Sequence, residues 1–528
     1  MSISWTFDYP SRRMPVLAAN VVATSQPLAA QAGLQMLARG GNAVDAAVAT
    51  AITLAVVEPT SNGIGSDAFA MVWDGRELAG LNSSGRSPAA WHPQRFAGRT
   101  CMPPLGWDSV TVPGAVAGWA ALSRRYGRLP FAELFEPAIA YARGGFVVSP
   151  VTAERWADAP ARYRDFPDFI RTFLPGGRAP AAGERFRCPD QADTLAQIAA
   201  TKGDAFYTGA LARRIADAAR AGGGALVMDD LAAHRAKWVT PIGVDYADCR
   251  LHELPPNGQG LAALIALGLL SRLDMPRYSP DSAEGVHLQI EAMKIAFAEA
   301  HHHIADPQFM TMDANALLSE TYLARRAADI RLDRATAPGP IPSLDGGTVY
   351  LATADAGGMM VSMIQSNYLG FGSGVVVAGT GISLQNRGCG FVLQPGHPNC
   401  VGGGKRPFHT IIPGFVTRDG VPVMSFGVMG GHMQPQGHVQ MMVRIFDHGQ
   451  NPQNACDAPR WFVDAGGRLA LEPGFDPSVR KGLAARGHRF LPGAETPLFG
   501  GGQLIYRLGE GEYLAASDPR KDGQAVGF

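Results

Sequence analysis

The sequence predicts a layered fold in which helices pack against the faces of β-sheets. Three observations support this prediction. Alanine-rich helical patterns dominate the first half of the chain, a clear β-hairpin stands near residue 350, and strand patterns separated by glycine loops fill most of the remainder. The chain has no internal repeat, which argues against a solenoid or propeller architecture.

The first 150 residues combine helical and strand patterns. Residues 28–38 have helical spacing, and Asn42 is expected to cap a second helix that continues to Val57. This second helix is apolar on nearly every side, as is typical of a buried helix. Further strands and helices are expected at residues 69–73, 77–81, 115–126 and 131–143.

The middle of the chain is less regular. From Arg143 to Gln191 it is rich in Pro, Arg and Asp and has no clear period, so we expect a surface excursion over the core. Residues 335–345 contain three prolines and are expected to form a loop or linker. Later helices are expected at residues 194–221, 283–302 and 437–447.

A predicted hairpin around residues 348–365 carries the main functional hypothesis. Residues 348–355 are β-branched and aromatic, residues 359–365 are mostly apolar, and Asp-Ala-Gly-Gly between them is typical of a turn. If residues 356–358 form the loop, direct pairing places Thr348 opposite Ser366. Cross-strand neighbours lie about 5 Å apart at Cβ, so the two hydroxyls are expected side by side.

Two glycines, Gly346 and Gly347, precede Thr348 and are expected to allow strained or positive-φ backbone. In such a geometry the threonine hydroxyl can attack its own preceding carbonyl. Cleavage at Gly347–Thr348 would free an α-amine with a pKa of about 8, which provides a built-in general base. The sequence therefore predicts Thr348 as an N-terminal nucleophile. The alternative is an ordinary turn before a strand that begins with Thr, and this stretch alone favours that alternative.

Composition excludes several classes of function. The 46 basic and 46 acidic residues balance, which argues against binding to nucleic acid or to an anionic membrane. The six cysteines are scattered without a C-x-x-C pair, so neither a disulfide framework nor a zinc site is expected. The first residues do not resemble a signal peptide, and the apolar runs are too short to span a bilayer. We expect a soluble cytoplasmic protein.

Cofactor and metal motifs are weak. Gly402-Gly403-Gly404-Lys405 lacks the Ser or Thr that follows Lys in a phosphate loop. His301-His302-His303 closes a helix, where imidazolium is favoured without any metal. His432 and His438 could face each other, but the sequence offers no third ligand. We therefore expect no metal and no organic cofactor.

Two further sites match the chemistry of acyl transfer. Gly430 and Gly431 follow an apolar strand, and paired glycines at that position can direct backbone N–H groups at an oxyanion. Arg387 could bind a substrate carboxylate through two parallel hydrogen bonds. The alternatives are a plain turn and a surface arginine.

An ordered set of motifs resembles the γ-glutamyltransferase family of N-terminal nucleophile hydrolases over nearly the whole chain. The matching segments include Ser25-Gln26-Pro27, Gly40-Gly41-Asn42-Ala43-Val44-Asp45, Gly63-Ile64-Gly65, Pro255-Pro256-Asn257-Gly258, Lys405-Arg406-Pro407 and Ser517-Asp518-Pro519. The resemblance implies an α+β fold, an αββα sandwich. It also implies a precursor that cuts itself into a large subunit, residues 1–347, and a small subunit, residues 348–528. These would form one intertwined αβ heterodimer, with further dimerisation open.

The resemblance also implies roles for individual residues. Thr348 falls on the family's nucleophile, Ser366 on its second hydroxyl, and Gly430 and Gly431 on its oxyanion hole. Departures from the family pattern concern the substrate. The family's carboxylate-binding Arg becomes Ser84, its amine-binding Gln and Asp become Arg387 and Gly390, its two serines become His409 and Thr410, and an Asn becomes Tyr368.

These departures turn an acidic, amine-binding wall into a basic one. A zwitterionic glutamyl group would lose its charged partners, at about 1–3 kcal/mol for each buried contact. A short amide whose far end is a carboxylate fits better, and the acylase- and amidase-type members of the family look most alike. Oxamate, hydrolysed to oxalate and ammonia in purine breakdown, is the substrate we expect, with Arg387, Tyr368, His409 and Thr410 lining its pocket. γ-Glutamyl hydrolysis or transfer, glutaryl-type acylase activity, and a non-catalytic binding protein remain as alternatives.

Overall fold

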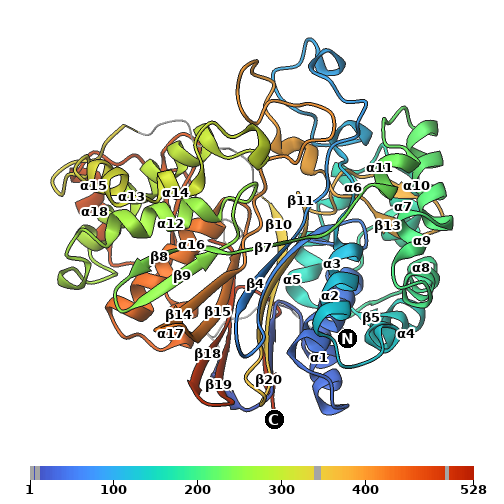
Figure 1. Ribbon diagram of the computed structural model, residues 1–528, viewed down its shortest axis with the longest axis horizontal. Coiled ribbons are helices and arrows are strands. Elements are labelled where there is room, and N and C mark those ends of the chain that lie inside the picture. The colour runs from blue at the N-terminus through green and yellow to red at the C-terminus, as the bar shows by residue number, and fades with distance from the viewer. Residues whose placement is uncertain (1–4, 6–11, 338–345, 494–498) are drawn as a thin grey trace.

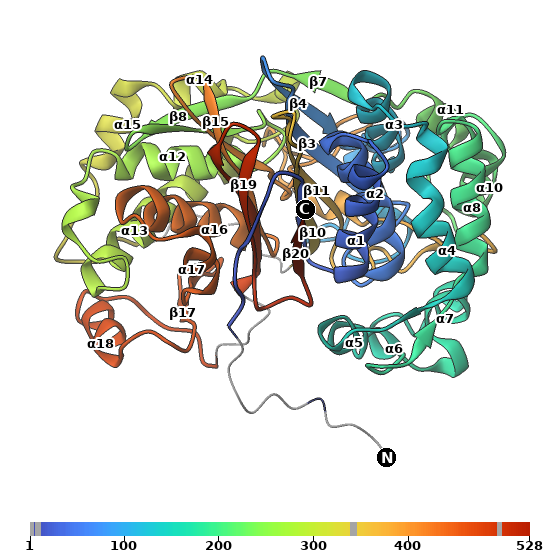
Figure 2. The same ribbon diagram turned by 90° about the horizontal axis from the view of Figure 1, so that it is seen from below.

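Two seven-stranded antiparallel sheets lie face to face between two layers of helices (Figure 1; Figure 2 shows the same arrangement from below). This computed structural model describes residue 5 and residues 12–337, 346–493 and 499–528. Most of the proline-containing linker predicted at residues 335–345 lies outside these ranges. The αββα sandwich that the resemblance implied is confirmed.

The first sheet has the strand order β1-β19-β18-β15-β14-β9-β8. Its strands, in that order, are Val16–Ala18, Glu512–Ser517, Gly501–Gly509, Val421–Met429, Gly414–Arg418, Cys249–Glu253 and Ile242–Tyr246. Strands from both ends of the chain therefore share this sheet.

The second sheet has the strand order β20-β2-β10-β11-β3-β4-β7. Its strands, in that order, are Gln524–Gly527, Val21–Thr24, Gly347–Ala354, Met360–Tyr368, Asp67–Trp73, Leu78–Ser83 and Lys237–Val239. The predicted hairpin forms the central pair β10 and β11, with β2 on one side and β3 on the other. Strands from before and after position 348 thus combine in a single hydrogen-bonded sheet.

One helical layer covers the outer face of the second sheet (right in Figure 1). Its helices are Pro27–Ala38 (α1), Ala43–Val57 (α2), Ala115–Tyr126 (α3), Glu136–Gly144 (α4), Pro150–Trp156 (α5), Ala159–Arg162 (α6), Pro167–Phe173 (α7), Pro189–Ala200 (α8), Asp204–Tyr207 (α9), Ala210–Ala221 (α10) and Met228–Ala232 (α11). As predicted, α2 is buried along its whole length, and Asn42 caps it in a reciprocal capping box with Asp45.

The other helical layer covers the first sheet (left in Figure 1). Its helices are Gly260–Leu270 (α12), Ala283–His303 (α13), Ala314–Leu317 (α14), Glu320–Ala327 (α15), Met433–Met442 (α16), Pro452–Asp457 (α17) and Pro477–Ala485 (α18). Helix α16 begins four residues earlier than predicted and continues as a π-helical turn, Val443–Asp447. The small pairs β5/β6 (Phe146–Val147, Arg185–Phe186), β12/β13 (Val376–Val377, Ile382–Ser383) and β16/β17 (Trp461–Val463, Leu469–Leu471) lie outside the two sheets.

Hydrophobic contacts hold the four layers together at three levels. One core lies between α1–α10 and the second sheet, another between α12–α18 and the first sheet. A third core joins the inner faces of the two sheets and contains Phe69, Tyr350 and Ile364 opposite Phe415 and Ile505. Burial of apolar area at each level stabilises the stack by about 25 cal/mol per Å².

The expectation of a surface excursion at residues 143–191 was wrong. Trp156, Tyr163, Phe169 and Phe173 in this segment are at most 1% exposed and pack around Phe371, just beyond β11. The segment forms helices of only four to seven residues, each with a proline in its first turn. Such short helices leave no readable period in the sequence, although their aromatic side chains build the core.

The helix predicted at residues 194–221 is divided into α8, α9 and α10. Gly203, with φ of +94°, and Gly209 lie at the two breaks. The other predicted helices and the strand pair β3/β4 are present, with ends that differ by a few residues. No helix among the described residues is both long and apolar enough to cross a membrane.

Candidate functional site

The pairing of β10 with β11 brings Thr348 and Ser366 together. Val349 pairs with Gln365, which is the predicted register, but Gly347 pairs with Tyr368, so the ladder shifts between them. Thr348 lies at this irregularity, with its Oγ1 3.3 Å from Ser366 Oγ. Both side chains are at most 1% exposed. A β-bulge at this point takes Thr348 out of the regular pairing of the two strands and changes the direction of its side chain.

Both hydroxyls contact the carbonyl oxygen that precedes Thr348. Thr348 Oγ1 lies 2.8 Å and Ser366 Oγ 2.7 Å from Gly347 O, and each hydroxyl can donate to it. Ser366 Oγ in turn accepts hydrogen bonds from Tyr368 N and from an Arg387 terminal nitrogen, both at 2.8 Å. With two N–H donors pointing at it, the serine hydroxyl directs its own proton toward the Gly347 carbonyl. This hydrogen bond polarises the Gly347 carbonyl, which belongs to the Gly347–Thr348 peptide bond at which the sequence predicts cleavage.

Gly346 and Gly347 lie in crowded surroundings. Gly347 does not have a positive φ, so the expectation of positive-φ backbone is not met at this residue. A β-carbon on Gly347 would lie 3.2 Å from Gly370 N and from Ser61 Cα. A β-carbon on Gly346 would lie 3.2 Å from Gly431 Cα. Close backbone approach therefore favours glycine at both positions.

Arg387 is a buried cation beside these hydroxyls. It begins the short 3₁₀ helix Arg387–Gly390, and its side chain is completely buried. One terminal nitrogen donates to Thr410 Oγ1 at 2.6 Å and the other to Ser366 Oγ, while Nε has no hydrogen-bond partner among the described residues. No carboxylate in the described ranges forms an ion pair with it, and burial lowers its pKa to about 10. A buried arginine without a paired anion is suited to receiving an anionic ligand.

The Tyr368 ring packs against the Arg387 guanidinium. The Arg387 guanidinium carbon lies 4.3 Å from the centroid of the tyrosine ring, a cation–π contact. Tyr368 has φ of +80°, which is rare for a bulky residue and places it at the bulge opposite Gly347. The structure thus brings the two predicted substrate-binding residues into direct contact.

His409 does not contact the hydroxyls. Its Nε2 lies 3.0 Å from Asp67 Oδ2, and its Nδ1 accepts from Ile411 N at 3.4 Å. Burial and the cations Arg387 and Arg406 hold its pKa well below the ordinary value, so the ring is neutral. The contact with Asp67 is therefore a hydrogen bond between a neutral ring and a carboxyl group.

Asp67, at the start of β3, was not anticipated. Burial raises its pKa to about 7, against the opposing effects of Arg387 and of N–H donors from Gly85 and Gly114. This carboxyl therefore titrates near neutral pH within the field of the buried arginine. The Gly63-Ile64-Gly65 motif lies just before it, but nothing in the spacing indicates that a carboxyl here meets residue 409.

Gly430 and Gly431 join β15 to α16, with φ of +117° and +58°. Their N–H groups donate no hydrogen bond within the part of the chain that the structure describes. Gly431 lies against the backbone at Gly346, one residue before the Gly347–Thr348 bond. Successive free N–H groups at a helix N-terminus are suited to stabilising negative charge on oxygen.

A second residue that the sequence did not single out is Gln259. Its amide nitrogen donates to Thr410 O at 2.5 Å and to Gly431 O at 2.9 Å, and its oxygen contacts His432 Nδ1 at 3.1 Å. It is completely buried and lies in the Pro-Pro-Asn-Gly-Gln-Gly segment. Gln259 therefore links Gly431 to Thr410, the residue whose hydroxyl binds Arg387.

Metal-ligating side chains do not gather at this site. Over residues 12–337, 346–493 and 499–528, the one such cluster is His287, Glu291 and His488. Its carboxylate is paired with Lys294 at 2.7 Å and accepts from Thr336. The cluster belongs to α13 and its neighbours and shares no residue with the Thr348 site.

Comparisons with known proteins identify the family of this chain. The Gamma-glutamyltranspeptidase family model matches residues 29–528. A glutathione hydrolase-like proenzyme of Bacillus subtilis is 36% identical, over 96% of this chain and 98% of the relative. The oxamate amidohydrolase proenzyme of Klebsiella pneumoniae is also 36% identical, over 95% of this chain and 97% of the relative.

Among solved structures, cephalosporin acylase from Bacillus halodurans superposes with a TM-score of 0.96 at 47% identity. The match covers 100% of this chain and 99% of the acylase. The gamma-glutamyltranspeptidase of Pseudomonas nitroreducens matches 63% of this chain and 97% of its own, at 30% identity and a TM-score of 0.56. The chain belongs to the gamma-glutamyltranspeptidase family and is an N-terminal nucleophile hydrolase that acts on amide bonds.

Proposed function

We propose that the chain cuts itself at Gly347–Thr348 and that Thr348 then hydrolyses a small amide that carries a carboxylate, with oxamate as the foremost substrate. The observation that carries this proposal is the buried Arg387 guanidinium, which reaches Ser366 Oγ beside the Gly347 carbonyl. The guanidinium is therefore positioned to bind a carboxylate that lies next to the reacting amide carbonyl. The proenzyme relatives support maturation into two subunits of one precursor.

Maturation would begin with attack of Thr348 Oγ1 on the Gly347 carbonyl carbon. The peptide C–N bond breaks, an ester forms at the threonine oxygen, and the hydroxyl proton passes to the amide nitrogen, which becomes the α-amine of Thr348. Ser366 Oγ–H, which already donates to Gly347 O, would stabilise the negative charge that develops there. Water then hydrolyses the ester and leaves Gly347 as a carboxylate at the end of the large subunit.

Turnover would repeat the same chemistry on the substrate. In the uncut chain Gly347 O is bonded to Thr348 Oγ1 and Ser366 Oγ, whereas a substrate carbonyl would direct its oxygen at Gly430 and Gly431. The new α-amine accepts the Thr348 hydroxyl proton, the oxygen attacks the amide carbon, and ammonia leaves with that proton. The unpaired N–H groups of Gly430 and Gly431 would bind the oxyanion, and water would release the acid from the acyl-threonine.

Substrate choice would rest on Arg387 and its neighbours. Its terminal nitrogens are bonded to Ser366 and Thr410 in the uncut chain, and both hydroxyls can give up these bonds to a carboxylate. The Tyr368 ring would keep the Arg387 guanidinium in its orientation through the cation–π contact. His409 is fully bonded to Asp67 and the backbone, so it would shape the wall of the pocket without touching the substrate.

A second candidate is an acylase that removes a longer carboxylate-bearing acyl group. The 47% identity with cephalosporin acylase over the whole chain favours it. Both candidates use the same nucleophile and the same arginine and differ only in the length of the chain between the amide and the carboxylate.

Ammonia release from oxamate by matured enzyme tests the proposal, with a glutaryl amide and a γ-glutamyl anilide as rival substrates. We expect oxamate turnover that Thr348→Ala abolishes and that Arg387→Ala weakens mainly through a higher KM. Turnover of the glutaryl amide alone would select the acylase. Turnover of the anilide alone would reject Arg387 as a clamp for amine-free acids.

A further inference from the structure

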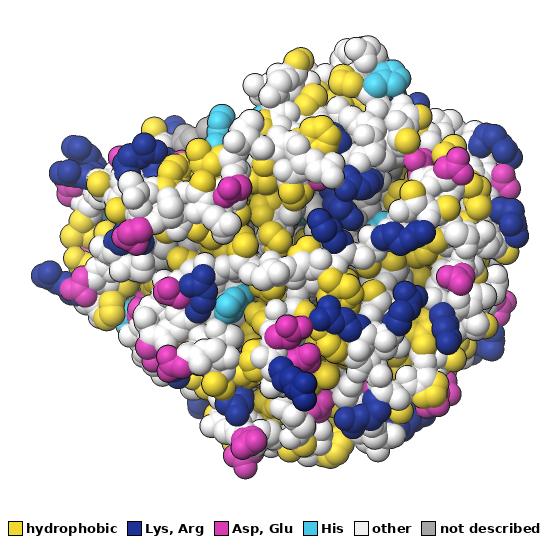
Figure 3. Space-filling model, in the orientation of Figure 1, with side chains coloured by type: hydrophobic (Ala, Val, Ile, Leu, Met, Phe, Trp, Pro, Cys, Tyr) yellow, Lys and Arg dark blue, Asp and Glu magenta, His cyan; other side chains and the backbone are white. Residues whose placement is uncertain are grey.

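A second basic site lies near the reaction centre but shares none of its residues. A pocket of about 500 Å³ opens to solvent between the Arg86 segment, α11 and the start of β7. Its lining includes neither Thr348, Ser366 and the glycine pair nor Arg387 and its contacts. Figure 3 shows Lys and Arg side chains gathered near the middle of the face on which α11 and β7 lie.

Arg406 is the distinctive residue of this pocket. It is 8% exposed, and its Nε donates to Ser84 O at 3.0 Å. Its two terminal nitrogens have no hydrogen bond or ion pair with any described residue, and they are not sealed from solvent. Its backbone N–H donates to Asp306, so the main chain is also held in place. A buried guanidinium is thus fixed at one end and presents its hydrogen-bonding edge to the cavity.

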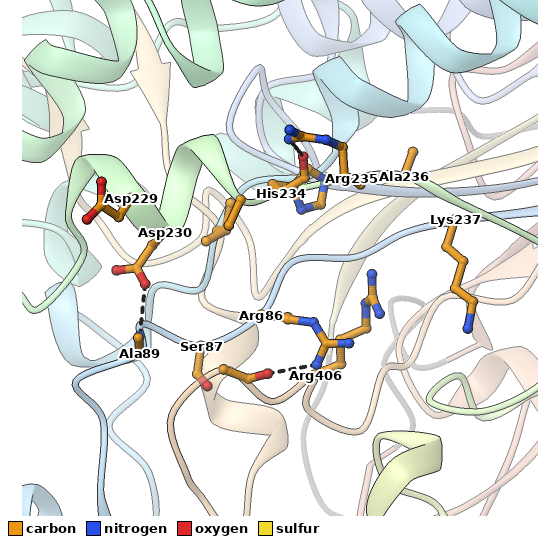
Figure 4. A pocket seen from close by; sticks show the side chains of 13 residues that line it. Arg86, Ser87, Ala89, Asp229, Asp230, His234, Arg235, Ala236, Lys237 and Arg406 are labelled. Atoms are coloured by element: carbon orange, nitrogen blue, oxygen red, sulfur yellow. Dashed lines mark hydrogen bonds between the residues drawn. The ribbon is translucent and has the colours of Figure 1, made fainter.

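Two further cations lie on the same side. Figure 4 shows Arg86 next to Arg406, with Lys237 on that side of the pocket. One Arg86 nitrogen is bonded to Asp306 and to Gly404 O, both at 2.7 Å. The exposed Lys237 has no partner among the residues that the structure describes. Among the described residues, the carboxylates that act on Arg406 are Asp306 and Asp67, against the three cations at this end of the pocket.

The acidic residues of the pocket lie at its other end. Figure 4 shows Asp229 and Asp230 on α11, away from Arg86 and Arg406. Asp230 is bonded to Ala89 N at 2.9 Å and Val227 N at 3.1 Å, so its oxygens are engaged by the backbone. The opposite end therefore keeps an excess of positive charge and unfilled N–H donors.

We propose that the Arg86–Arg406–Lys237 end of this pocket is a binding site for a small dianion with carboxylate or phosphate oxygens. Planar guanidinium groups bind such oxygens in pairs, and an ammonium adds a point charge. The cavity has room for a ligand of this size and for its first waters. Such a site differs from the reaction centre, where Arg387 is completely buried and its terminal nitrogens already have partners.

An anion bound in this pocket would change the electrostatic environment of Asp67 and His409, which lie beside Arg387. Arg406 precedes His409 by three residues, and its charge contributes to the electrostatic environment of both His409 and Asp67. The segment that bears Ser84 and Arg86 also carries Gly85, whose N–H binds Asp67. A dianion at Arg406 would therefore reduce the positive field on the Asp67–His409 pair.

Isothermal titration of matured enzyme with sodium oxalate, and separately with inorganic phosphate, in a chloride buffer tests the site. We expect one of these anions to bind, and Lys237→Glu to weaken its affinity at least tenfold. Lys481→Glu is the matched control, because Lys481 is exposed and lies outside the pocket. It should change the affinity less than twofold. Arg406→Lys keeps the charge but loses the planar edge, and should weaken binding about tenfold.

The two arms identify the oxygens that the site prefers, and either preference supports it. Absence of binding by both anions would overturn the proposal. So would equal affinities of the Lys237→Glu and Lys481→Glu enzymes. Binding that Arg387→Ala removes and Lys237→Glu leaves intact would place the anion in the reaction centre, which also overturns it.

Discussion

Two buried arginines of this chain use opposite ends of the same chemical group. Arg387 bonds through its terminal nitrogens to Ser366 and Thr410, and its Nε has no hydrogen-bond partner in the part of the chain that the structure describes. Arg406 bonds through Nε to Ser84 O, and its terminal nitrogens have no partner among the same residues. The terminal nitrogens of Arg387 can bind a ligand only when the ligand replaces the Ser366 and Thr410 hydroxyls. Those of Arg406 face solvent already. The same residue type therefore positions groups in the uncut reaction centre and remains ready for a ligand in the neighbouring pocket.

The strongest way to break this comparison is to remove the nucleophile. Thr348→Ala should leave a single uncut chain of 55.8 kDa on a denaturing gel. The wild-type chain should run as two pieces, the smaller one beginning at Thr348 by N-terminal sequencing. Amide hydrolysis should fall by at least ~10³-fold, about 4 kcal/mol in the barrier, because no acyl-enzyme can form. An uncut but active wild-type chain would contradict the assignment.

The next test separates the two hydroxyls. Ser366→Ala removes the hydrogen bond to Gly347 O and should slow self-cleavage by about 10²-fold, as expected for one lost oxyanion donor. Ser362→Ala on the same strand is the matched control, since Ser362 is also buried but bonds to Tyr350 OH. The half-time of processing after expression or in-vitro translation measures both. Equal half-times would mean that Ser366 only fills space.

A smaller effect is expected from changing the geometry of the cation. Arg387→Lys keeps the charge but cannot reach Ser366 and Thr410 together, so kcat/KM for a carboxylate-bearing amide should fall about tenfold to hundredfold. The loss should lie mainly in KM. An amide of equal size without a carboxylate should lose much less, and steady-state kinetics on both substrates decide the point. Equal losses would indicate a structural role for the arginine.

The smallest effect concerns pH. The Asp67 pKa is raised from 3.8 to about 7, so between these values the folded chain holds more protons than the unfolded chain. Asp67 therefore lowers the free energy of unfolding as pH rises from about 4 to about 7, by at most ~4 kcal/mol. Asp67→Asn lacks this term, so its melting temperature relative to wild type should rise by a few degrees between pH 5 and pH 8. A difference that does not change with pH would remove Asp67 from the titration.

Local patterns were sufficient for the reaction centre's backbone. The hairpin register follows from a turn at Asp355 and from alternation on both strands, and these are properties of neighbouring residues. The cap at Asn42 and the buried helix α2 were readable for the same reason. The resemblance to a known family then supplied the layer order and positions such as Gly430, which no local pattern shows to be near Thr348.

Contacts between distant segments were beyond local patterns. Asp67 and His409 are 342 residues apart, and their hydrogen bond exists only because the start of β3 and the loop before β14 meet in the folded chain. The aromatic core of residues 143–191 was missed because its helices are too short to show a period. The sequence also could not show that backbone atoms of Ser61, Gly370 and Gly431 lie close to the glycines before Thr348.

The sequence by itself determined which residues form the β10–β11 hairpin and that a threonine and a serine would lie side by side on it, because pairing across a short turn depends only on neighbouring residues. Tertiary structure alone decided that Arg387 reaches this serine, that His409 is occupied by Asp67, and that Arg406 faces a separate basic pocket. These outcomes depend on how two sheets and two helical layers stack. Burial and charge at a given residue are set by segments hundreds of positions away, which no local pattern encodes.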